Sequence, residues 1–280
     1  MTLAPLDRWT LAYIGVASAF LGLRWTSLPD GHGGFVLLHV VAAGAALLAP
    51  RLRLGGAVGR FVGEFYPLLL LYPLYAELGA LNAVAPTFHD ARVQTWETLL
   101  FGGQPSSGWI RAQPWPWLSN LLHAAYLSYH LILAGAPLGL WLSGRAGGAR
   151  RTVTAMMICF YACYTVFLLF PVAGPRYLFP LAHNAATATP LAVFTQQLLD
   201  AASSRGTAFP SSHVAAALVA SLTALREWRP LGAALLPAAL LLALGTIYGQ
   251  LHYAVDALAG AAVAALILAA GSRLAGRAAV

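Results

Sequence analysis

His252 and Asp256 are the residues of this chain whose types and spacing most directly suggest chemistry, because they lie four positions apart. In a helix, two such side chains lie one above the other, about 6 Å apart along the axis. The carboxylate could then accept a hydrogen bond from one imidazole nitrogen, which fixes the tautomer and leaves the other nitrogen free to attack a substrate. A His–Asp pair at this spacing is more often structural than catalytic, so the pair alone does not predict an enzyme.

A second group of residues, Phe209-Pro210-Ser211-Ser212-His213, has the composition of a helix start that binds an anion. Proline suits the first turn of a helix, and the free amides of that turn can point at a phosphate. Ser211 or Ser212 could add a hydroxyl donor, and His213 could give a proton to a departing oxygen. The alternative is a serine N-cap beside an incidental histidine.

A third group, Gly174-Pro175-Arg176-Tyr177, places a permanent cation after a rigid turn. The planar guanidinium of Arg176 could clamp the oxygens of a phosphoryl group, although a single interfacial arginine is common in membrane proteins. We include Tyr177 and Arg205 as further substrate-binding candidates, because Tyr177 adjoins Arg176 and Arg205 lies five residues before Pro210.

The composition of the chain indicates which elements must position these residues. Of 280 residues, 59% are hydrophobic and only 9% are charged, which is too apolar for a soluble domain. Eight stretches are apolar enough to cross a bilayer, although the last two are separated only by a short polar segment and could be one. They lie near residues 9–24, 34–50, 62–84, 117–142, 152–172, 210–225, 231–248 and 251–272. We therefore expect an all-α polytopic integral membrane protein with about eight transmembrane helices.

The arginines predict how these helices are oriented, because cytoplasmic loops collect positive charge. All 16 basic residues are arginine. Eleven fall on the side of the N-terminus, namely Arg8, Arg51, Arg53, Arg60, Arg145, Arg150, Arg151, Arg226, Arg229, Arg273 and Arg277. Five fall on the opposite side, namely Arg24, Arg92, Arg111, Arg176 and Arg205. Both termini should therefore be cytoplasmic, and all three groups of candidate residues should face the extracytoplasmic side.

Two long connections, residues 85–116 and 173–209, are expected on that outer side. In the fourth predicted span, His123, Tyr126 and His130 share one face, where they could line a headgroup pocket or join helices by hydrogen bonds. Glu77, in the third span, has the same two interpretations. The two cysteines, Cys159 and Cys163, lie in one apolar segment and are most simply core packing.

The order of the three groups, Arg, then Pro-Ser-x-His, then His-x-x-x-Asp, resembles the type 2 phosphatidic acid phosphatase superfamily over roughly residues 62–272. The resemblance implies that His252 is the nucleophile that becomes phosphohistidine, that Asp256 supports it and that His213 is the general acid. It also implies a phospholipid or sphingolipid-like substrate taken from the lipid bilayer, and no metal or other cofactor. Residues 1–60 would add two transmembrane helices in front of a six-helix catalytic bundle formed by residues 61–280.

Some positions depart from the usual pattern of that superfamily. Leu169 stands where a lysine is usual, Gly245 and Thr246 replace a Ser-Arg pair, and Ser212 replaces a glycine. This pattern looks like the inositol phosphorylceramide synthase branch, and the segment Leu100–Pro105 is similar to bacterial members. The resemblance then implies transfer of a headgroup phosphate to a lipid alcohol, in a bacterial cytoplasmic membrane.

Two other functions are compatible with the same residues. One is a plain lipid phosphate phosphatase, and another, from a different class, is a proton-coupled transporter or channel that uses the buried His and Asp. Nucleic-acid binding is not expected, because the arginines are scattered singly or in pairs rather than forming a stripe. His89, Asp90 and Glu97 are the only loop group that could bind a metal, and they are a weak candidate. The sequence makes no prediction of an oligomeric state.

Overall fold

The computed structural model of the chain describes residues 2–277 and, in the last helix, side chains only as far as Gly271. The described chain is all-α, with one isolated pairing of extended residues, Val172 with Thr207. Its helices are α1 (Pro5–Arg24), η1 (Trp25–Ser27), α2 (Gly33–Arg53), α3 (Ala57–Ala83), α4 (Asp90–Phe101), α5 (Pro105–Ala112), α6 (Pro116–Leu127), α7 (Tyr129–Leu142), α8 (Ala146–Leu169), α9 (Pro175–Leu178), α10 (Pro190–Ala202), α11 (Ser212–Glu227), α12 (Arg229–Tyr248) and α13 (Ala254–Arg277).

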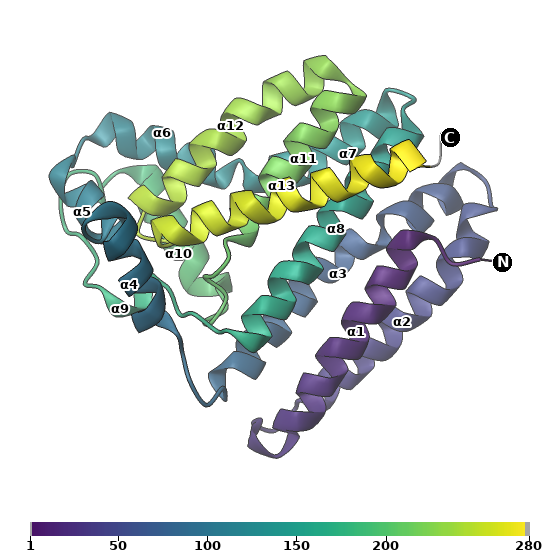
Figure 1. Cartoon of the computed structure of the whole chain (residues 1–280), viewed down its shortest axis with the longest axis horizontal. Helices are drawn as coiled ribbons and strands as arrows, with labels where there is room; N and C mark the ends of the chain where they lie inside the picture. The colour runs from purple at the N-terminus through teal and green to yellow at the C-terminus, as the bar shows by residue number, and fades with distance from the viewer. Residues whose placement is uncertain (1, 278–280) are drawn as a thin grey trace.

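Helix α11 lies at the centre of the bundle and packs against α7, α8, α12 and α13 (Figure 1). Three consecutive alanines, Ala215–Ala217, are fully buried in it, and small side chains of this kind let helices approach closely. Cys159 and Cys163 of α8 are buried with free thiols, as expected for core packing.

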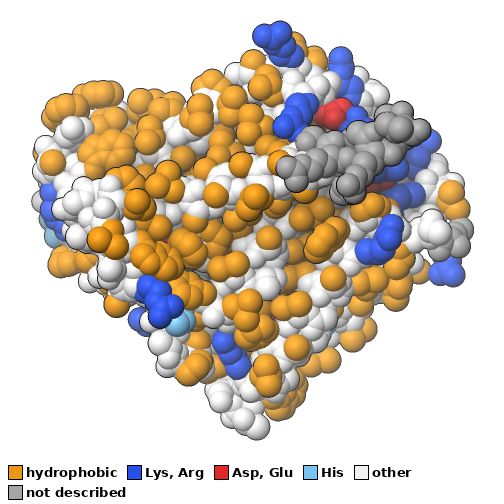
Figure 2. All heavy atoms as spheres, viewed as in Figure 1, with side chains coloured by type: hydrophobic (Ala, Val, Ile, Leu, Met, Phe, Trp, Pro, Cys, Tyr) orange, Lys and Arg blue, Asp and Glu red, His pale blue; other side chains and the backbone are white. Residues whose placement is uncertain are grey.

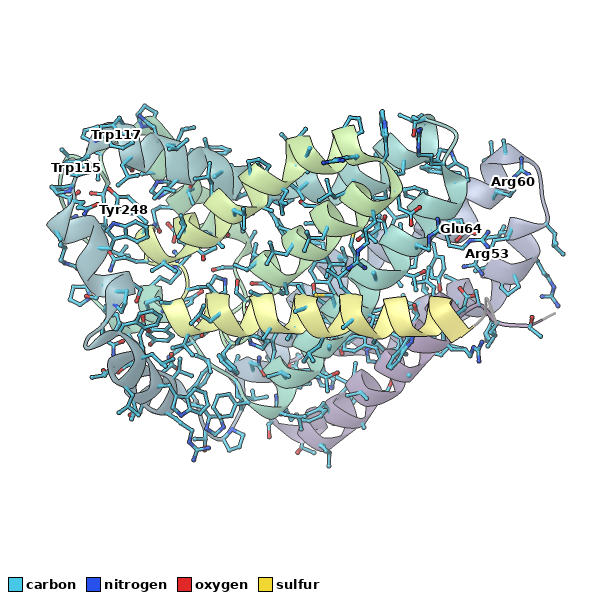
Figure 3. The ribbon with its side chains drawn as sticks, turned by 45° about the horizontal axis from the view of Figure 1, so that its top comes forward. Arg53, Arg60, Glu64, Trp115, Trp117 and Tyr248 are labelled. Carbon is cyan, nitrogen blue, oxygen red and sulfur yellow. The ribbon has the colours of Figure 1, made fainter. Side chains whose placement is uncertain are left out.

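Helices α1, α2 and α3 pack together at one side of the molecule, and α1 and α3 also contact α8 (Figure 1). Ion pairs hold one end of this assembly. Arg53 donates to both carboxylate oxygens of Asp7, over 2.8 Å at Oδ1, and also pairs with Glu64. Figure 3 shows Arg53 and Glu64 directed toward one another. Because each buried carboxylate has a cationic partner, these charges can lie inside the bundle.

Four helices are long and apolar enough to cross a membrane: α2, α8, α12 and the described part of α13. Helices α6 and α7 could form a fifth span, bent by 43° at the break between them. The chain is therefore an all-α protein with four or five candidate membrane spans. Each of the eight predicted stretches overlaps a helix, but α1 and α3 do not meet the same test of length and composition, and α11 has only 16 residues.

The structure also changes two details of the expected elements. The predicted fourth span, residues 117–142, is two helices that meet at Ser128. The predicted long connections are partly helical, since α4 and α5 lie in the first and α9 and α10 in the second.

Candidate functional site

The three groups of candidate residues meet in space at Gly174. Its backbone has φ +98°, a conformation that residues with a side chain rarely adopt. A Cβ added there would lie 3.1 Å from the Cβ of Ala208 and 3.6 Å from the carbonyl oxygen of Leu251. Ala208 N also donates to the carbonyl of Val172 over 3.0 Å. The backbone segments that lead into Arg176, His213 and His252 are thus in direct contact, which requires glycine at this position.

His252 lies just before α13, which begins at Ala254. Its Nδ1 is 2.9 Å from the carbonyl oxygen of Ala208 and 3.4 Å from Oδ2 of Asp256. A carbonyl oxygen can only accept, so Nδ1 carries the proton and Nε2 keeps its lone pair. Among the described residues, Nε2 has no hydrogen-bond partner. The geometry therefore leaves a nucleophilic nitrogen, as the sequence suggested, but the shorter contact on Nδ1 is to a backbone carbonyl.

Asp256 is fully buried in the first turn of α13. Its Oδ2 accepts a hydrogen bond from Tyr253 N over 2.8 Å, and its Oδ1 has no hydrogen-bond partner among the described residues. Its carbonyl accepts from Ser211 N over 2.9 Å, which ties the start of α11 to α13. The two helices touch at Gly260, where an added Cβ would lie 2.4 Å from the carbonyl oxygen of Ser211.

His213 lies in the first turn of α11, beside His252, with 5.7 Å between the two ring centroids. Ser211 is the N-cap, and its hydroxyl accepts from Val214 N over 3.4 Å. The amides of Ser212 and His213 have no hydrogen bond among the described residues, as is usual in a first turn. The structure thus places a second imidazole beside the ring of His252, at the start of a helix whose first amides are open.

Arg176 and Arg205 both lie against the ring of Tyr177, with their guanidinium carbons 5.5 and 5.7 Å from the ring centroid. Arg176 forms an ion pair with Asp200 through Nη2, while its Nη1 is buried without a hydrogen-bond partner in the described chain. Tyr177 has its hydroxyl 2.8 Å from Oγ of Ser203. The structure therefore brings the two arginines together, with one buried guanidinium nitrogen still able to donate.

A cavity of about 470 Å³ reaches the site from within the bundle. Ser212 and His213 form part of its wall, and most of the remaining wall is aromatic and aliphatic. The wall is made by Leu68, Leu71, Tyr72, Tyr75, Tyr126, Tyr129, His130, Leu133, Ala134, Phe160, Tyr164, Leu198, Leu199, Ala202 and Ser203 together with those two residues. The ring of Tyr129 lies tilted against that of His213, with 4.4 Å between the centroids. The cavity is thus mostly apolar, with polar groups near one imidazole.

Of the three candidate polar residues of the fourth predicted span, two line the cavity and His123 has neither of the roles considered for it. Tyr126 and His130 line the cavity. His123 does not line the cavity. Its Nδ1 lies 2.8 Å from the carbonyl oxygen of Ser119, so this hydrogen bond stays within one helix. Glu77 joins helices, since its carboxylate lies 3.0 Å from Nε2 of His39.

The sequence suggested Asp90 and Glu97 only as part of a weak metal-binding group, whereas in the structure these two carboxylates of α4 contact the same loops. Asp90 accepts hydrogen bonds from Ala173 N and Gly174 N, both over 2.9 Å. Glu97 accepts from Ala254 N over 3.0 Å. The sequence signal for this role is their spacing of seven, which places both on one helix face. No group of three His, Cys, Asp or Glu residues that could hold a metal ion occurs in the part of the chain that the structure describes.

Comparison with known protein families matches residues 92–270 to the PAP2 superfamily. The match covers more than half of the chain and includes all three groups of candidate residues. The chain therefore belongs to the PAP2 superfamily and carries a membrane phosphatase-like domain of that type. Comparisons with curated proteins and with solved structures gave no match.

Proposed function

We propose that this protein is a membrane-embedded lipid phosphatase or phosphotransferase that cleaves a lipid phosphoester through a phosphohistidine at His252. The observation that carries the proposal is the tautomer of His252. Its Nδ1 donates to a carbonyl oxygen 2.9 Å away, so the lone pair is on Nε2, in a ring that neighbours the ring of His213. Membership of the PAP2 superfamily supports phosphomonoester substrates, which in that family are often lipids.

The phosphate would be bound by donors from three segments. The unpaired Nη1 of Arg176, the open amides of Ser212 and His213, and the side chain of Ser211 or Ser212 are all suited to phosphoryl oxygens. Arg205 would add positive charge near this set, because its guanidinium also lies against the ring of Tyr177. This set needs no metal, so activity should persist in EDTA.

Two steps then follow from the positions of the imidazoles. Nε2 of His252 attacks phosphorus, the bond from phosphorus to the leaving oxygen breaks, and that oxygen takes a proton from protonated His213. In the second step, neutral His213 accepts a proton from water or an alcohol, whose oxygen attacks phosphorus while the phosphorus–nitrogen bond breaks. Asp256 would stabilise the positive charge that develops on the His252 ring. Both histidines return to their starting states.

Transfer of a headgroup phosphate to a lipid alcohol is the form of this reaction that we favour. Two positions that usually carry a cation in the superfamily are uncharged here. One is Leu169, which is 64% exposed, and the other is Thr246, which is fully buried. The apolar cavity beside His213 has room for the chain of a lipid alcohol in the acceptor step. Both features support the inositol phosphorylceramide synthase-like branch. Plain hydrolysis, with water as acceptor, uses the same residues.

We further propose that eight spans cross a bacterial cytoplasmic membrane, formed by α1, α2, α3, the bent pair α6–α7, α8, α11, α12 and α13. Residues 1–60 would be an added hairpin, and residues 61–280 the catalytic bundle. Figure 3 supports opposite membrane faces, since Arg53, Arg60 and Glu64 lie at one end of the bundle and Trp115, Trp117 and Tyr248 at the other. The site would lie at the aromatic end, and the arginine asymmetry supports placing that end on the extracytoplasmic side. The side chains of Arg273 and Arg277 lie outside those described.

The test is incubation of the purified protein with labelled lipid phosphates, with and without ceramide, diol lipids or inositol, resolving free phosphate from new phospholipid. We expect cleavage that is lost in His252→Ala and that persists in EDTA. New phospholipid with an added alcohol would support transfer, and free phosphate alone would support hydrolysis. Ion flux without any cleavage would instead support the transporter alternative.

A further inference from the structure

Helix α4 lies outside the central bundle and packs against α13 near the beginning of that helix (Figure 1). One face of α4 is buried and carries Asp90, Val93 and Glu97, whereas Thr95 on the other face is exposed. Gln94, half-buried beside this face, donates to the hydroxyl of Tyr253 over 2.9 Å. A helix at this position would need no buried carboxylates if its only function were to cover apolar surface, because burying a charge is costly.

Asp90 holds the loop that leads to Arg176. Each of its carboxylate oxygens accepts one amide, from Ala173 and from Gly174, over 2.9 Å. Its Oδ1 also lies 3.2 Å from the hydroxyl of Tyr253, the residue that follows His252. One carboxylate therefore contacts both the segment of the phosphate-clamping arginine and the segment of the proposed nucleophile.

Glu97 holds the beginning of α13. Its Oε1 accepts the amide of Ala254, the first residue of that helix, and its Oε2 is buried without a hydrogen-bond partner in the described chain. A carboxylate at a helix N-terminus is stabilised by the open amides there. Here the carboxylate comes from another helix, so it fixes where α13 starts relative to α4.

We infer that Asp90 and Glu97 are positioning residues, through which α4 sets the Arg176 loop and the His252 end of α13 in register for one phosphoryl group. The inference rests on the proposed function of His252 and Arg176. Neither carboxylate touches the open Nε2 of His252, so both act through the backbone that they hold. A displacement of about 1 Å at reacting groups can cost on the order of a hundredfold in rate.

The first test compares Asp90→Ala and Glu97→Ala with Thr95→Ala, a matched change on the exposed face of the same helix. We expect kcat per folded molecule to fall about a hundredfold in Glu97→Ala with little change in KM, because the phosphate donors remain in place. Asp90→Ala should lower kcat and raise KM, because the loop of Arg176 is released. Thr95→Ala should match the wild type. Glu97→Gln keeps a carbonyl oxygen for Ala254 N and should recover most of kcat.

Glu97 also predicts a dependence on pH. Its burial raises the pKa of its carboxyl to about 7, against the amide of Ala254, which lowers this pKa, while the charge of Asp256 in α13 raises it further. A carboxyl with a raised pKa binds its proton more tightly in the folded protein, so its contribution to stability is full below the ordinary pKa and falls as pH rises toward 7. Between pH 5 and 8, the Tm of the wild type should therefore fall more than that of Glu97→Gln. Parallel curves would contradict this assignment of Glu97.

Hydrogen–deuterium exchange provides a readout that does not depend on activity. We expect faster exchange at residues 173–174 in Asp90→Ala and at residue 254 in Glu97→Ala, with Thr95→Ala unchanged. Alanine variants that exchange normally and turn over like the wild type would overturn the inference and leave the proposed function standing. A wild-type protein without phosphoester cleavage would defeat the proposed function, and the exchange data would still decide whether α4 positions the two segments.

Discussion

At His252, two oxygens of different kinds act on the same ring nitrogen. The carbonyl of Ala208, at 2.9 Å, determines that Nδ1 carries the proton. Oδ2 of Asp256, at 3.4 Å, supplies negative charge near the ring. The tautomer and the charge are therefore provided by separate groups, whereas one carboxylate provides both in the Ser-His-Asp triad.

This division predicts a moderate effect of Asp256→Asn. The carbonyl of Ala208 still fixes the tautomer, so only the stabilisation of the charged ring is lost. We expect kcat to fall about ten- to a hundredfold, less than the ~10⁴-fold seen when a triad carboxylate is neutralised and the tautomer changes. Steady-state kinetics on lipid phosphate, with His252→Ala alongside, measures this. A loss as complete as that of His252→Ala would show that Asp256 also controls the tautomer.

His213 should fail in a different way from His252. As a proton donor, His213 should raise the rate by about a hundredfold to ten-thousandfold when the leaving group is poor. The gain should be much smaller for a group that leaves as a stable anion. A nitrophenyl phosphoester should therefore partly rescue His213→Ala and leave His252→Ala inactive. The comparison needs only kcat for the two substrates in the two variants. Rescue of His252→Ala and not of His213→Ala would reverse the two roles.

A residue of the site could be predicted from the sequence where its side chain belongs to a recognisable motif. Contacts made by the backbone could not be predicted in this way. His213, His252 and Asp256 stand in ordered motifs, and the structure brings them together. The carbonyl of Ala208 leaves no mark in the sequence, because every residue has one. Asp90 and Glu97 were visible only as loop acids, since their partners are backbone amides more than 75 positions away in the chain.

At the scale of helices, the contact between α11 and α13 depends on Gly260. Gly260→Ala would place a methyl group 2.4 Å from the carbonyl oxygen of Ser211, which cannot move without shifting the start of α11. We expect a loss of about 1–3 kcal/mol in stability, as for other overpacked sites, and lower activity because Ser211 is tied to Asp256.

Gly271→Ala is the matched control, because no other part of the described chain lies within 4 Å of a Cβ added there. Thermal unfolding and turnover of both variants in the same detergent give the comparison. If Gly260→Ala were as stable and active as Gly271→Ala, the close packing of α11 on α13 would not be needed to build the site.

Apolar runs in the sequence predicted where the helices lie. They did not predict where a helix is broken. Residues 117–142 read as one continuous span, yet the chain bends by 43° between α6 and α7, at Ser128, whose hydroxyl bonds the carbonyl of Ala125 over 2.6 Å. Helix α4 has too little apolar surface to be recognised as a span, and its buried face is defined by loops from distant parts of the chain.

On the scale of the whole molecule, charge is distributed unevenly. Figure 2 shows arginine side chains gathered toward the end at which Figure 1 places both termini, with fewer near α4 and α9 at the opposite end. Much of the surface between the ends is hydrophobic (Figure 2). This arrangement suits a protein whose middle faces lipid and whose arginine-rich end faces the cytoplasm.

The proposed orientation predicts which positions can be labelled from outside a cell. Single cysteines at Arg205 and at Arg145, both exposed, would be introduced after replacing the buried Cys159 and Cys163 by alanine. We expect a membrane-impermeant maleimide to label position 205 in intact cells and position 145 only after permeabilisation. The reverse pattern would place the site in the cytoplasm and overturn the orientation without affecting the chemistry.

Trapping the phosphoenzyme shows whether His252 carries the phosphoryl group. Purified protein would be mixed with lipid phosphate labelled at phosphorus, quenched within one turnover under alkaline conditions and digested for mass spectrometry. Our account predicts a phosphoryl group on His252 that is stable in alkali and labile in acid, present in the wild type and absent from His252→Ala. Label on another residue, or cleavage at wild-type rate in His252→Ala, would contradict it.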